Sequence, residues 1–390
     1  MSIEGRSDAG SGRRLKLGMV GGGQGAFIGA VHRLAARMDD QYEFVAGALS
    51  STPEKSIASG DELGLPPDRN YRDYISMAAA EMHRPDTIDL VSIVTPNHMH
   101  FPVARTFLEA GINVICDKPM TTTSAEAAEL QRMVAAKGLV FAVTYNYSGY
   151  PMIRQAREMV KSGALGELRL VQGEYPQDWL TTALETTGQK QADWRTDPSR
   201  SGAGGCVGDI GTHTYQLACD VSGLELDSLL AELTSFVPGR KLDDDAHVLL
   251  RFKGGAKGAI WASQVAVGHD NGLKLRVYGS KGGLEWTQAD PNYLWFTPYG
   301  EPKRLIVRGG AGAGAAAGRV TRVPPGHPEG YLEGFANIYT EAARAIRARR
   351  DGKMVEHDVH FPTVDDGAKG VAFVEACVKS SSSGNQWVKV

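Results

Sequence analysis

Cysteine is scarce in this sequence, and the few cysteines do not pair. The 390 residues contain four of them, Cys116, Cys206, Cys219 and Cys377, with no CxxC spacing. This pattern argues against a disulfide framework or a zinc module. We expect small, buried side chains in a cytoplasmic protein without a metal site.

Long apolar runs and a strong excess of one charge are also missing. No run approaches the roughly 20 apolar residues that span a bilayer. The polar N-terminus MSIEGRSDAGSGRR lacks the apolar core of a secretory signal, so we expect a disordered lead-in over residues 1–14 and no membrane partner. The formal net charge of -3 argues against a nucleic-acid binder. The length predicts two domains.

The first part of the chain alternates between two patterns. Short apolar runs, typical of buried parallel strands, cover Leu15–Val20, Glu43–Leu49, Ile88–Val94, Ile112–Cys116 and Leu139–Thr144. Stretches with helical spacing lie between several of them, at Ala30–Met38, Pro102–Ala110 and Ser124–Ala136. This alternation predicts a doubly wound α/β domain, a Rossmann dinucleotide-binding domain, over residues 15–144.

The pattern changes after residue 150. Strand-like runs follow with few helices between them, at Leu168–Glu174, Leu229–Phe236, Ala246–Phe252, Gly258–Ala266, Leu273–Tyr278, Gly283–Glu285 and Leu294–Thr297. Helices are predicted at Ile153–Ser162, Tyr215–Val221, Tyr331–Arg349 and Asp366–Lys379. Residues 145–390 are therefore predicted to form an α+β domain with a mostly antiparallel sheet and helices on one face.

A glycine-rich stretch follows the first predicted strand. Residues Gly21, Gly22, Gly23, Gln24, Gly25 and Ala26 fit the pattern G-x-G-x-x-A between a strand and a helix. Such glycines let backbone N–H groups approach a pyrophosphate at a helix N-terminus. The alternative is a purely structural turn. The helical spacing begins only near Gly29, which predicts a longer loop than usual.

The end of the second predicted strand bears on the choice of dinucleotide. An NAD site usually has an acid at that point, whereas Asp39 and Asp40 precede the strand and Ser50, Ser51 and Lys55 follow it. Hydroxyls and a lysine suit a 2′-phosphate, so we predict NADP in preference to NAD. The same segment also fits a simple helix start with Pro53 as its first residue.

Three further stretches place polar groups where chemistry is expected. Thr95, Asn97, His98 and His100 follow the third Rossmann strand, whose carboxyl end faces the ligand crevice. Lys118 follows the next strand and precedes Pro119, which favours an extended backbone. Asp209 and His213 are four residues apart, on one side of a turn or helix. An aspartate there can orient the imidazole as a general base, although such pairs are often only a cap and an exposed histidine.

Together these stretches resemble the Gfo/Idh/MocA oxidoreductase family, which includes glucose–fructose oxidoreductase and inositol dehydrogenases. The resemblance extends from about residue 15 over nearly the whole chain. It rests on T-P-N-x-x-H at 95–100, E-K-P at 117–119, W-R-x-D-P at 194–198 and G-G-x-x-x-D-x-G-x-H at 204–213. One departure is Asp117, which stands where the family has glutamate, so the contact of that carboxylate must be made differently.

The resemblance implies an enzyme that moves hydride between a nicotinamide and a carbinol or carbonyl of a sugar, polyol or inositol. Lys118, Asp209 and His213 would be catalytic. Cofactor contacts are expected at Gly21, Gly23, Gln24, Gly25, Ala26, Ser50, Ser51, Lys55, Thr95, Asn97, His100 and Lys118. Substrate contacts are expected at Tyr145, Asn146, Trp194, Arg195, Asp209 and His213. For the tyrosines and for Trp194 and Arg195, packing is the alternative.

Other outcomes stay open. Some family members are redox-mediated glycosidases, with no net use of cofactor, and others are non-catalytic sensors; intact Lys118, Asp209 and His213 argue against a sensor. A large open sheet in the second domain, which the family shares, predicts a homodimer or homotetramer. The second glycine-rich run, residues 308–318, leads into "RVPPGHPEG", which cannot be a phosphate-binding helix. We interpret it as a mobile loop, a lid or a subunit contact.

Overall fold

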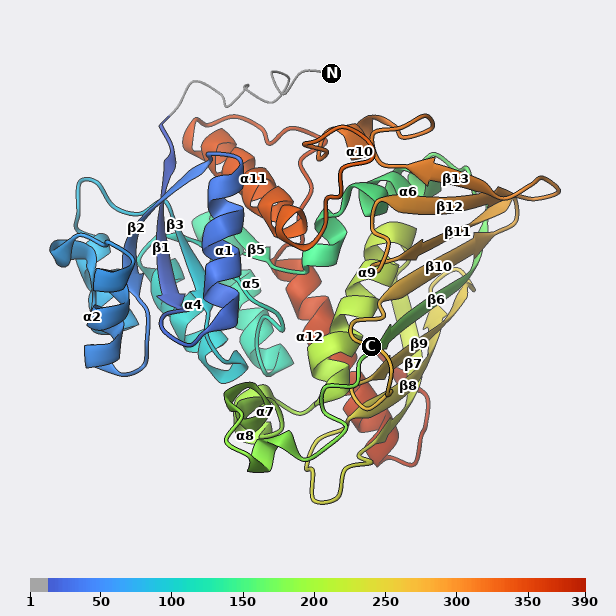
Figure 1. The fold of residues 1–390 in the computed structure, drawn as a ribbon, viewed down its shortest axis with the longest axis horizontal. Helices are drawn as coiled ribbons and strands as arrows, with labels where there is room; N and C mark the ends of the chain where they lie inside the picture. Colours follow the sequence, from blue (N-terminus) through green and yellow to red (C-terminus); the bar gives the residue numbers. More distant parts are fainter. Residues whose placement is uncertain (1–12) are drawn as a thin grey trace. The chain divides into compact units, whose positions relative to one another are not determined.

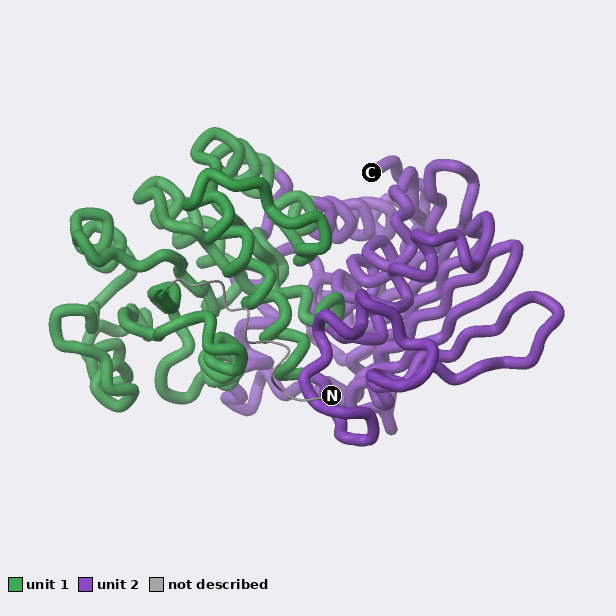
Figure 2. Tube along the Cα trace, turned by 90° about the horizontal axis from the view of Figure 1, so that it is seen from above, with its two compact units in different colours: residues 1–121, 125–149, 331–368 green, residues 122–124, 150–330, 369–390 purple. Residues whose placement is uncertain are grey.

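The computed structural model describes residues 13–390 (Figure 1). All but the last two residues of the predicted lead-in lie outside this range. The chain forms two compact units, coloured separately in Figure 2. Unit 1 contains the described residues up to 121, with 125–149 and 331–368. Unit 2 contains residues 122–124, 150–330 and 369–390.

Unit 1 is built on a five-stranded parallel sheet in the order β2-β1-β3-β4-β5. Its strands are β1 (Leu15–Gly21), β2 (Tyr42–Ala48), β3 (Leu90–Val94), β4 (Asn113–Cys116) and β5 (Phe141–Val143). The connecting helices are α1 (Phe27–Met38), α2 (Pro53–Glu62), α3 (Tyr74–Glu81), α4 (His100–Glu109) and α5 (Ser124–Lys137). Five strands were predicted here, each within three residues of its observed ends, and the predicted Rossmann fold is confirmed. Helix α3 was not predicted.

Apolar side chains fill both faces of this sheet. Val91 and Val114 pack on one face with Phe107 of α4. Leu17 and Ile115 belong to a second cluster, on α1 and α11 (Tyr331–Arg350). Continuous apolar strands are required here because both faces of the parallel sheet are covered.

Helix α11 belongs to unit 1, although it follows the strands of that unit by almost 200 residues. Its residues Phe335, Ala336, Tyr339 and Ala342 are buried against the sheet, and the helix runs beside α1. Residues 331–368 were predicted to lie in the second domain, so the observed division of the chain differs there. The predicted boundary at 144/145 falls close to the observed one after Gly149.

Unit 2 is built on a nine-stranded sheet in the order β13-β12-β11-β10-β6-β9-β8-β7-β14. The strands are β6 (Leu168–Pro176), β7 (Leu226–Thr234), β8 (Asp245–Phe252), β9 (Lys257–Ser263), β10 (Lys274–Gly279), β11 (Gly282–Thr287), β12 (Tyr293–Pro298), β13 (Arg304–Val307) and β14 (Val388–Lys389). All neighbours are antiparallel except β6 and β9. The predicted mostly antiparallel sheet is therefore confirmed; β13 and β14 were not predicted.

Helices cover one face of this sheet (Figure 1). They include α6 (Pro151–Lys161), α9 (Thr212–Ser222) and the part of α12 (Val364–Ser382) that follows residue 368. The short helices α7 (Lys190–Arg195), α8 (Pro198–Ser201) and α10 (Ala315–Gly318) complete the unit. Along β8, Ala246, Val248 and Leu250 are buried, whereas the alternate residues His247 and Leu249 are exposed. The sheet thus presents its second face to solvent.

All four cysteines lie in the described part of the chain and are free thiols. Cys116, Cys206 and Cys377 are buried and Cys219 is half-buried. Among residues 13–390, no helix combines the length and the apolar composition needed to cross a bilayer.

Candidate functional site

The glycine loop between β1 and α1 is held in a conformation that favours glycine. Gly21, Gly22 and Gly25 have positive φ angles of 81°, 74° and 75°. Helix α1 begins at Phe27, immediately after Ala26. Gly29 therefore lies inside the helix, and a Cβ atom there would collide with the carbonyl oxygen of Gly22. Gly29 thus allows the first turn of α1 to pack directly on the loop.

The same loop is tied to the end of β2. Gly23 N donates to Leu49 O at 3.1 Å, and a Cβ at Gly23 would lie 2.6 Å from that oxygen. Gln24 N donates to Ser59 Oγ at 3.1 Å. The side chain of Gln24 donates to Glu62 of α2 at 2.9 Å. A side chain at Gly22 or Gly23 would therefore collide with neighbouring backbone, whereas one at Gly25 would meet no atom within 4 Å.

The segment after β2 begins a helix, which agrees with the interpretation of this segment as a helix start with Pro53 as its first residue. Pro53 is the first residue of α2, and the preceding Thr52 makes no side-chain capping bond. Ser51 and Lys55 are exposed and Ser50 is half-buried. No carboxylate lies between the end of β2 and Pro53.

The polar residues after β3 differ in whether their side chains are already hydrogen-bonded. Thr95 follows the strand, and within the described residues its buried hydroxyl has no hydrogen-bond partner. Asn97 is buried on the short helix η3 (Asn97–Met99). His100 is fully buried, with Nε2 2.9 Å from Thr95 O and Nδ1 2.7 Å from Pro119 O. Burial lowers the pKa of His100. Both nitrogens of His100 thus face main-chain carbonyls, which favours a structural role over direct contact with a cofactor.

Lys118 follows β4 and is preceded by the carboxylate of Asp117. Asp117 Oδ1 lies 3.1 Å from His32 Nε2 and accepts a bond from Thr144 Oγ1 at 2.6 Å. Burial alone would raise the pKa of Asp117, but the interaction with His32 and the hydrogen bonds from His32 and Thr144 lower it to about 2. The contact that the shorter side chain of Asp117 makes is therefore to His32, a residue of α1 that the sequence analysis did not single out.

Asp209 and His213 lie in unit 2, on two consecutive helical segments. Asp209 belongs to a π-helical turn, η6 (Val207–Gly211), which continues directly into α9. Isolated π turns inside helices often mark functional sites. His213 is almost buried, at 8% exposure, and its ring lies 6.3 Å from that of Tyr175. The predicted Asp–His pair is thus placed on one continuous helix.

The carboxylate of Asp209 is held by two side chains from separate segments. Gln264 Nε2 donates to Asp209 Oδ2 at 2.9 Å, and Arg195 Nε lies 3.3 Å from the same oxygen. Arg195 also stacks on Trp194, with its guanidinium carbon 4.2 Å from the ring centroid. The structure therefore brings Asp209, Arg195 and Trp194 together. Gln264 was not predicted, because a single glutamine after a strand carries no motif.

The N-terminus of the π turn is capped by another carboxylate that the sequence analysis missed. Asp243 accepts bonds from Gly205 N at 2.6 Å and from Val207 N at 2.7 Å. Burial raises the pKa of Asp243 to about 6, against the opposing effect of these two backbone donors. A Cβ at Gly205 would collide with the carbonyl oxygen of Asp243. The cap and the glycine together fix where the helix that carries Asp209 and His213 begins.

The residues after β5 are all buried. Tyr145, Asn146, Tyr147 and Tyr150 have exposures of 0%, 2%, 3% and 1%. Among the described residues, the side-chain nitrogen of Asn146 has no hydrogen-bond partner. Tyr150 packs edge-on against Trp286, which agrees with the packing interpretation for this tyrosine.

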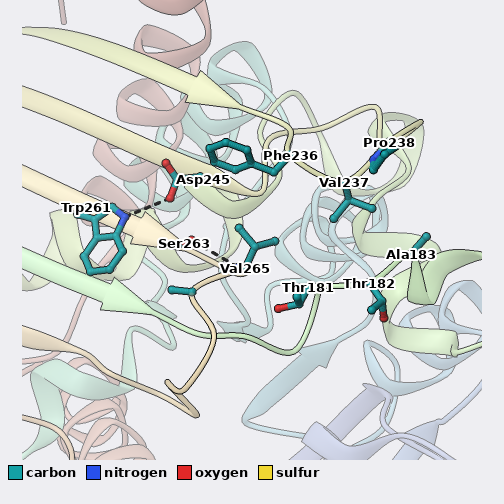
Figure 3. A pocket seen from close by; sticks show the side chains of 11 residues that line it. Thr181, Thr182, Ala183, Phe236, Val237, Pro238, Asp245, Trp261, Ser263 and Val265 are labelled. Atoms are coloured by element: carbon teal, nitrogen blue, oxygen red, sulfur yellow. Dashed lines mark hydrogen bonds between the residues drawn. The ribbon is translucent and has the colours of Figure 1, made fainter.

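A hollow of about 710 Å³ lies at one end of the exposed sheet face of unit 2 (Figure 3). Trp261, Asp245 and Phe236 line it, and Trp261 Nε1 donates to Asp245 at 3.1 Å. None of the predicted site residues lines this hollow.

The glycine-rich run at 308–318 is attached to the rest of unit 2 at two points. Arg308 is 1% exposed and its guanidinium lies 3.0 Å from the buried carboxylate of Glu329. Gly314 N donates to Gln155 of α6 at 2.6 Å. The run is thus anchored at Arg308 and Gly314, while Gly309, Ala311 and Gly312 between them are exposed.

Comparison with known proteins assigns both units to one family. The family model "Oxidoreductase family, NAD-binding Rossmann fold" matches residues 15–145, and the GFO/IDH/MocA C-terminal domain matches residues 153–285. An oxidoreductase from Sinorhizobium meliloti is 58% identical, with a TM-score of 0.89, over 97% of this chain and 100% of that chain.

Two relatives have been solved with ligands. An inositol dehydrogenase homologue from Azotobacter vinelandii, complexed with NADH and myo-inositol, is 37% identical, with a TM-score of 0.91, over 97% of this chain and 98% of that chain. Levoglucosan dehydrogenase, complexed with NADH and levoglucosan, is 26% identical, with a TM-score of 0.82, over 97% and 99%. The family matches, the Rossmann unit and the large second sheet lead to one conclusion. The chain belongs to the Gfo/Idh/MocA family and is an NAD-binding oxidoreductase.

Proposed function

We propose that this protein is a dehydrogenase or reductase that acts on a carbinol of a sugar, polyol or inositol-like substrate. The observation that supports this most directly is the Asp209–His213 pair, on a capped helix with the carboxylate held by Gln264 and Arg195. The two ligand-bound relatives, named for inositol and levoglucosan, support this substrate class.

The chain's own residues would divide the work as follows. Oxidation of a carbinol requires removal of the hydroxyl proton as the hydride leaves carbon. His213 accepts that proton, and the carboxylate of Asp209 stabilises the resulting imidazolium or binds a neighbouring hydroxyl. Lys118 places a positive charge beside the oxygen on which negative charge develops. Tyr145, Asn146, Trp194 and Arg195 are proposed to bind the remaining hydroxyls and the ring of the substrate.

The glycine loop that precedes helix α1 is the proposed site for the dinucleotide pyrophosphate, because Gly25, with a positive φ and open space around it, lies directly before the N-terminus of that helix. The buried hydroxyl of Thr95 has no partner within the described residues and supplies a further polar contact. The nicotinamide would supply the hydride acceptor or donor.

We further propose that the site accepts both NADH and NADPH. The ligand-bound relatives support NADH. The absence of a carboxylate between β2 and Pro53, and the exposed Lys55, support room and charge for a 2′-phosphate. Ser50 and Ser51 would contribute hydroxyl donors.

The test of the main proposal is a screen of polyols, inositols and sugars with NAD and with NADP, followed by absorbance of the reduced cofactor. We expect reduced cofactor in proportion to oxidised substrate, and no signal from the His213→Ala variant. Cleavage of aryl glycosides with catalytic cofactor and no net absorbance change would instead support a redox-mediated glycosidase. Binding of NADH without turnover of any substrate would support a sensor.

We also propose that copies of this chain associate through the exposed sheet face of unit 2. Leu249, Leu170 and Trp295 are 51%, 45% and 40% exposed on strands β8, β6 and β12, and such exposed apolar side chains favour association. Light scattering should show a dimer or tetramer that Leu249→Arg weakens. A monomer at micromolar concentration would contradict this proposal.

A further inference from the structure

A connected set of five polar side chains, four of them buried and Asp117 half-buried, includes the residue that precedes Lys118. His32 is on α1, Ser92 on β3, Asp117 after β4, Thr144 after β5 and Tyr339 on α11. His32 Nε2 lies 3.1 Å from Asp117 Oδ1, and His32 Nδ1 lies 2.8 Å from the Tyr339 hydroxyl. Ser92 Oγ lies 2.8 Å from the same hydroxyl and 3.2 Å from His32 Nδ1. All five side chains belong to unit 1.

The chemistry of these groups assigns the protons. An ionised carboxylate can only accept, so His32 carries a proton on Nε2 and donates it to Asp117. With a neutral imidazole, Tyr339 donates to His32 Nδ1 and Ser92 donates to the Tyr339 oxygen. Thr144 donates to Asp117 at 2.6 Å. In this arrangement every polar hydrogen of the set has an acceptor within the set, as a buried network requires.

The other side of Lys118 is held by a second buried histidine. His100 Nδ1 lies 2.7 Å from Pro119 O, while its Nε2 lies 2.9 Å from Thr95 O. Lys118 therefore stands between two residues, Asp117 and Pro119, each of which contacts a fully buried imidazole.

We propose that His32 is a positioning residue for the reaction. Through Asp117 it fixes the main chain that carries Lys118, and it links that main chain to α1, the helix that starts at the glycine loop. A glutamate at position 117 would be one methylene longer and could not keep its carboxylate in the same place against His32. Asp117 and His32 thus form a matched pair in this chain. This inference rests on the proposed catalytic role of Lys118.

The test compares His32→Gln, which keeps an N–H donor near Asp117, with His32→Leu, which removes it. Misplacing a catalytic group costs turnover more than binding. We expect His32→Leu to lower kcat about tenfold or more with little change in substrate KM, and His32→Gln to restore most of the loss. Tyr42→Phe removes a buried hydroxyl that donates to the main-chain oxygen of Tyr339 and lies outside this set, so it serves as the control and should stay near wild type.

A second readout does not depend on turnover. In cofactor-free protein, trace acetylation followed by mass spectrometry measures the reactivity of the Lys118 amine against pH, with the exposed Lys161 as reference. We expect His32→Leu to change the Lys118 profile and leave that of Lys161 unchanged. If the leucine variant does not fold, Asp117→Glu, which displaces the carboxylate, replaces it in both measurements.

Equal behaviour of the glutamine and leucine variants in both measurements would overturn the proposal, because packing alone would then explain the histidine. A wild-type protein inactive on every substrate would contradict the proposed function. The acetylation profiles would still decide the role of His32 in that case.

Discussion

The amide of Gln264 donates to the Oδ2 atom of Asp209 at 2.9 Å. Gln264 is 2% exposed, and its main chain is itself fixed, since its N donates to Asp244 O at 2.8 Å and its O accepts from Leu180 N at 3.0 Å. The donor to Asp209 is therefore held in position by the main-chain hydrogen bonds of Gln264. Because Asp209 lies one helical turn before His213, this bond helps to set the orientation of the carboxylate that serves the proposed general base.

Removal of this donor should lower activity. We expect Gln264→Leu to reduce kcat/KM by about tenfold to hundredfold, because Asp209 loses a fixed donor and a general base loses its orientation. Steady-state kinetics with an accepted polyol would measure this. Gln177→Leu removes an amide that bonds Asn271 instead and is the matched control. Equal losses of kcat/KM in both variants would contradict a specific role in catalysis for the bond from Gln264 to Asp209.

Lys118 and His213 should each be essential for turnover. We expect Lys118→Ala and His213→Ala to cut kcat at least about 100-fold, the scale of losing a charge stabiliser or an acid–base group. Fluorescence titration with NADH should show little change in affinity for His213→Ala. Near-normal turnover in either variant would remove that residue from the proposed mechanism.

Gly29 should be required for dinucleotide binding. A methyl group at Gly29 would collide with the backbone of Gly22, so Gly29→Ala must displace the glycine loop or the first turn of α1. We expect NADH affinity to fall about tenfold or more, since each 1.4 kcal/mol of strain is a factor of ten. Gly318→Ala, where a Cβ meets nothing within 4 Å, is the control. Unchanged affinity for Gly29→Ala would mean that the loop can adapt without loss of binding.

Lys55 should distinguish the two dinucleotides. It is exposed on the first turn of α2, and a lysine there attracts a 2′-phosphate but has no charged partner on a 2′-hydroxyl. We expect Lys55→Ala to weaken NADPH binding several-fold, within the roughly 1 kcal/mol typical of exposed charge pairs, and to leave NADH binding unchanged. Equal effects on both cofactors in calorimetric titration would show that Lys55 does not contact the 2′ position.

The sequence predicted those parts of the fold that depend on local pattern. The apolar strands Leu15–Gly21 and Leu90–Val94 were found because burial on both faces requires continuous apolar runs. Helix α3 was missed, since its segment YISMAAAE has no clear amphipathic spacing. The placement of α11 against the first sheet was also missed, because packing between distant segments leaves no periodic signal.

The same distinction holds for the candidate site. Lys118, Asp209 and His213 could be proposed from the sequence because they stand in ordered motifs. Their supporting residues were not found, because each acts by a contact across the fold: His32 reaches Asp117 over 85 positions and Gln264 reaches Asp209 over 55. The substitution of aspartate for glutamate at 117 was the available signal, and it predicted a different contact without naming the partner.

The ionisation of Asp117 should make the fold sensitive to acid in a defined direction. The pKa of this carboxyl is about 2 in the folded protein, against an ordinary value of 3.8. A folded pKa below the unfolded one contributes stability above pH 3.8, and that contribution is lost as the pH falls toward 2. The difference corresponds to roughly 2 kcal/mol at neutral pH.

We expect Asp117→Asn to lower the urea midpoint of unit 1 near pH 7, and the difference in midpoint from wild type to disappear as the pH falls. Thr106→Val, which removes a hydroxyl bonded to Pro102 O on α4, carries no titrating group and should keep a constant gap. If the difference in urea midpoint between Asp117→Asn and wild type were also independent of pH, the Asp117 carboxyl would titrate alike in the folded and unfolded chain. His32 would then not stabilise the charge of Asp117.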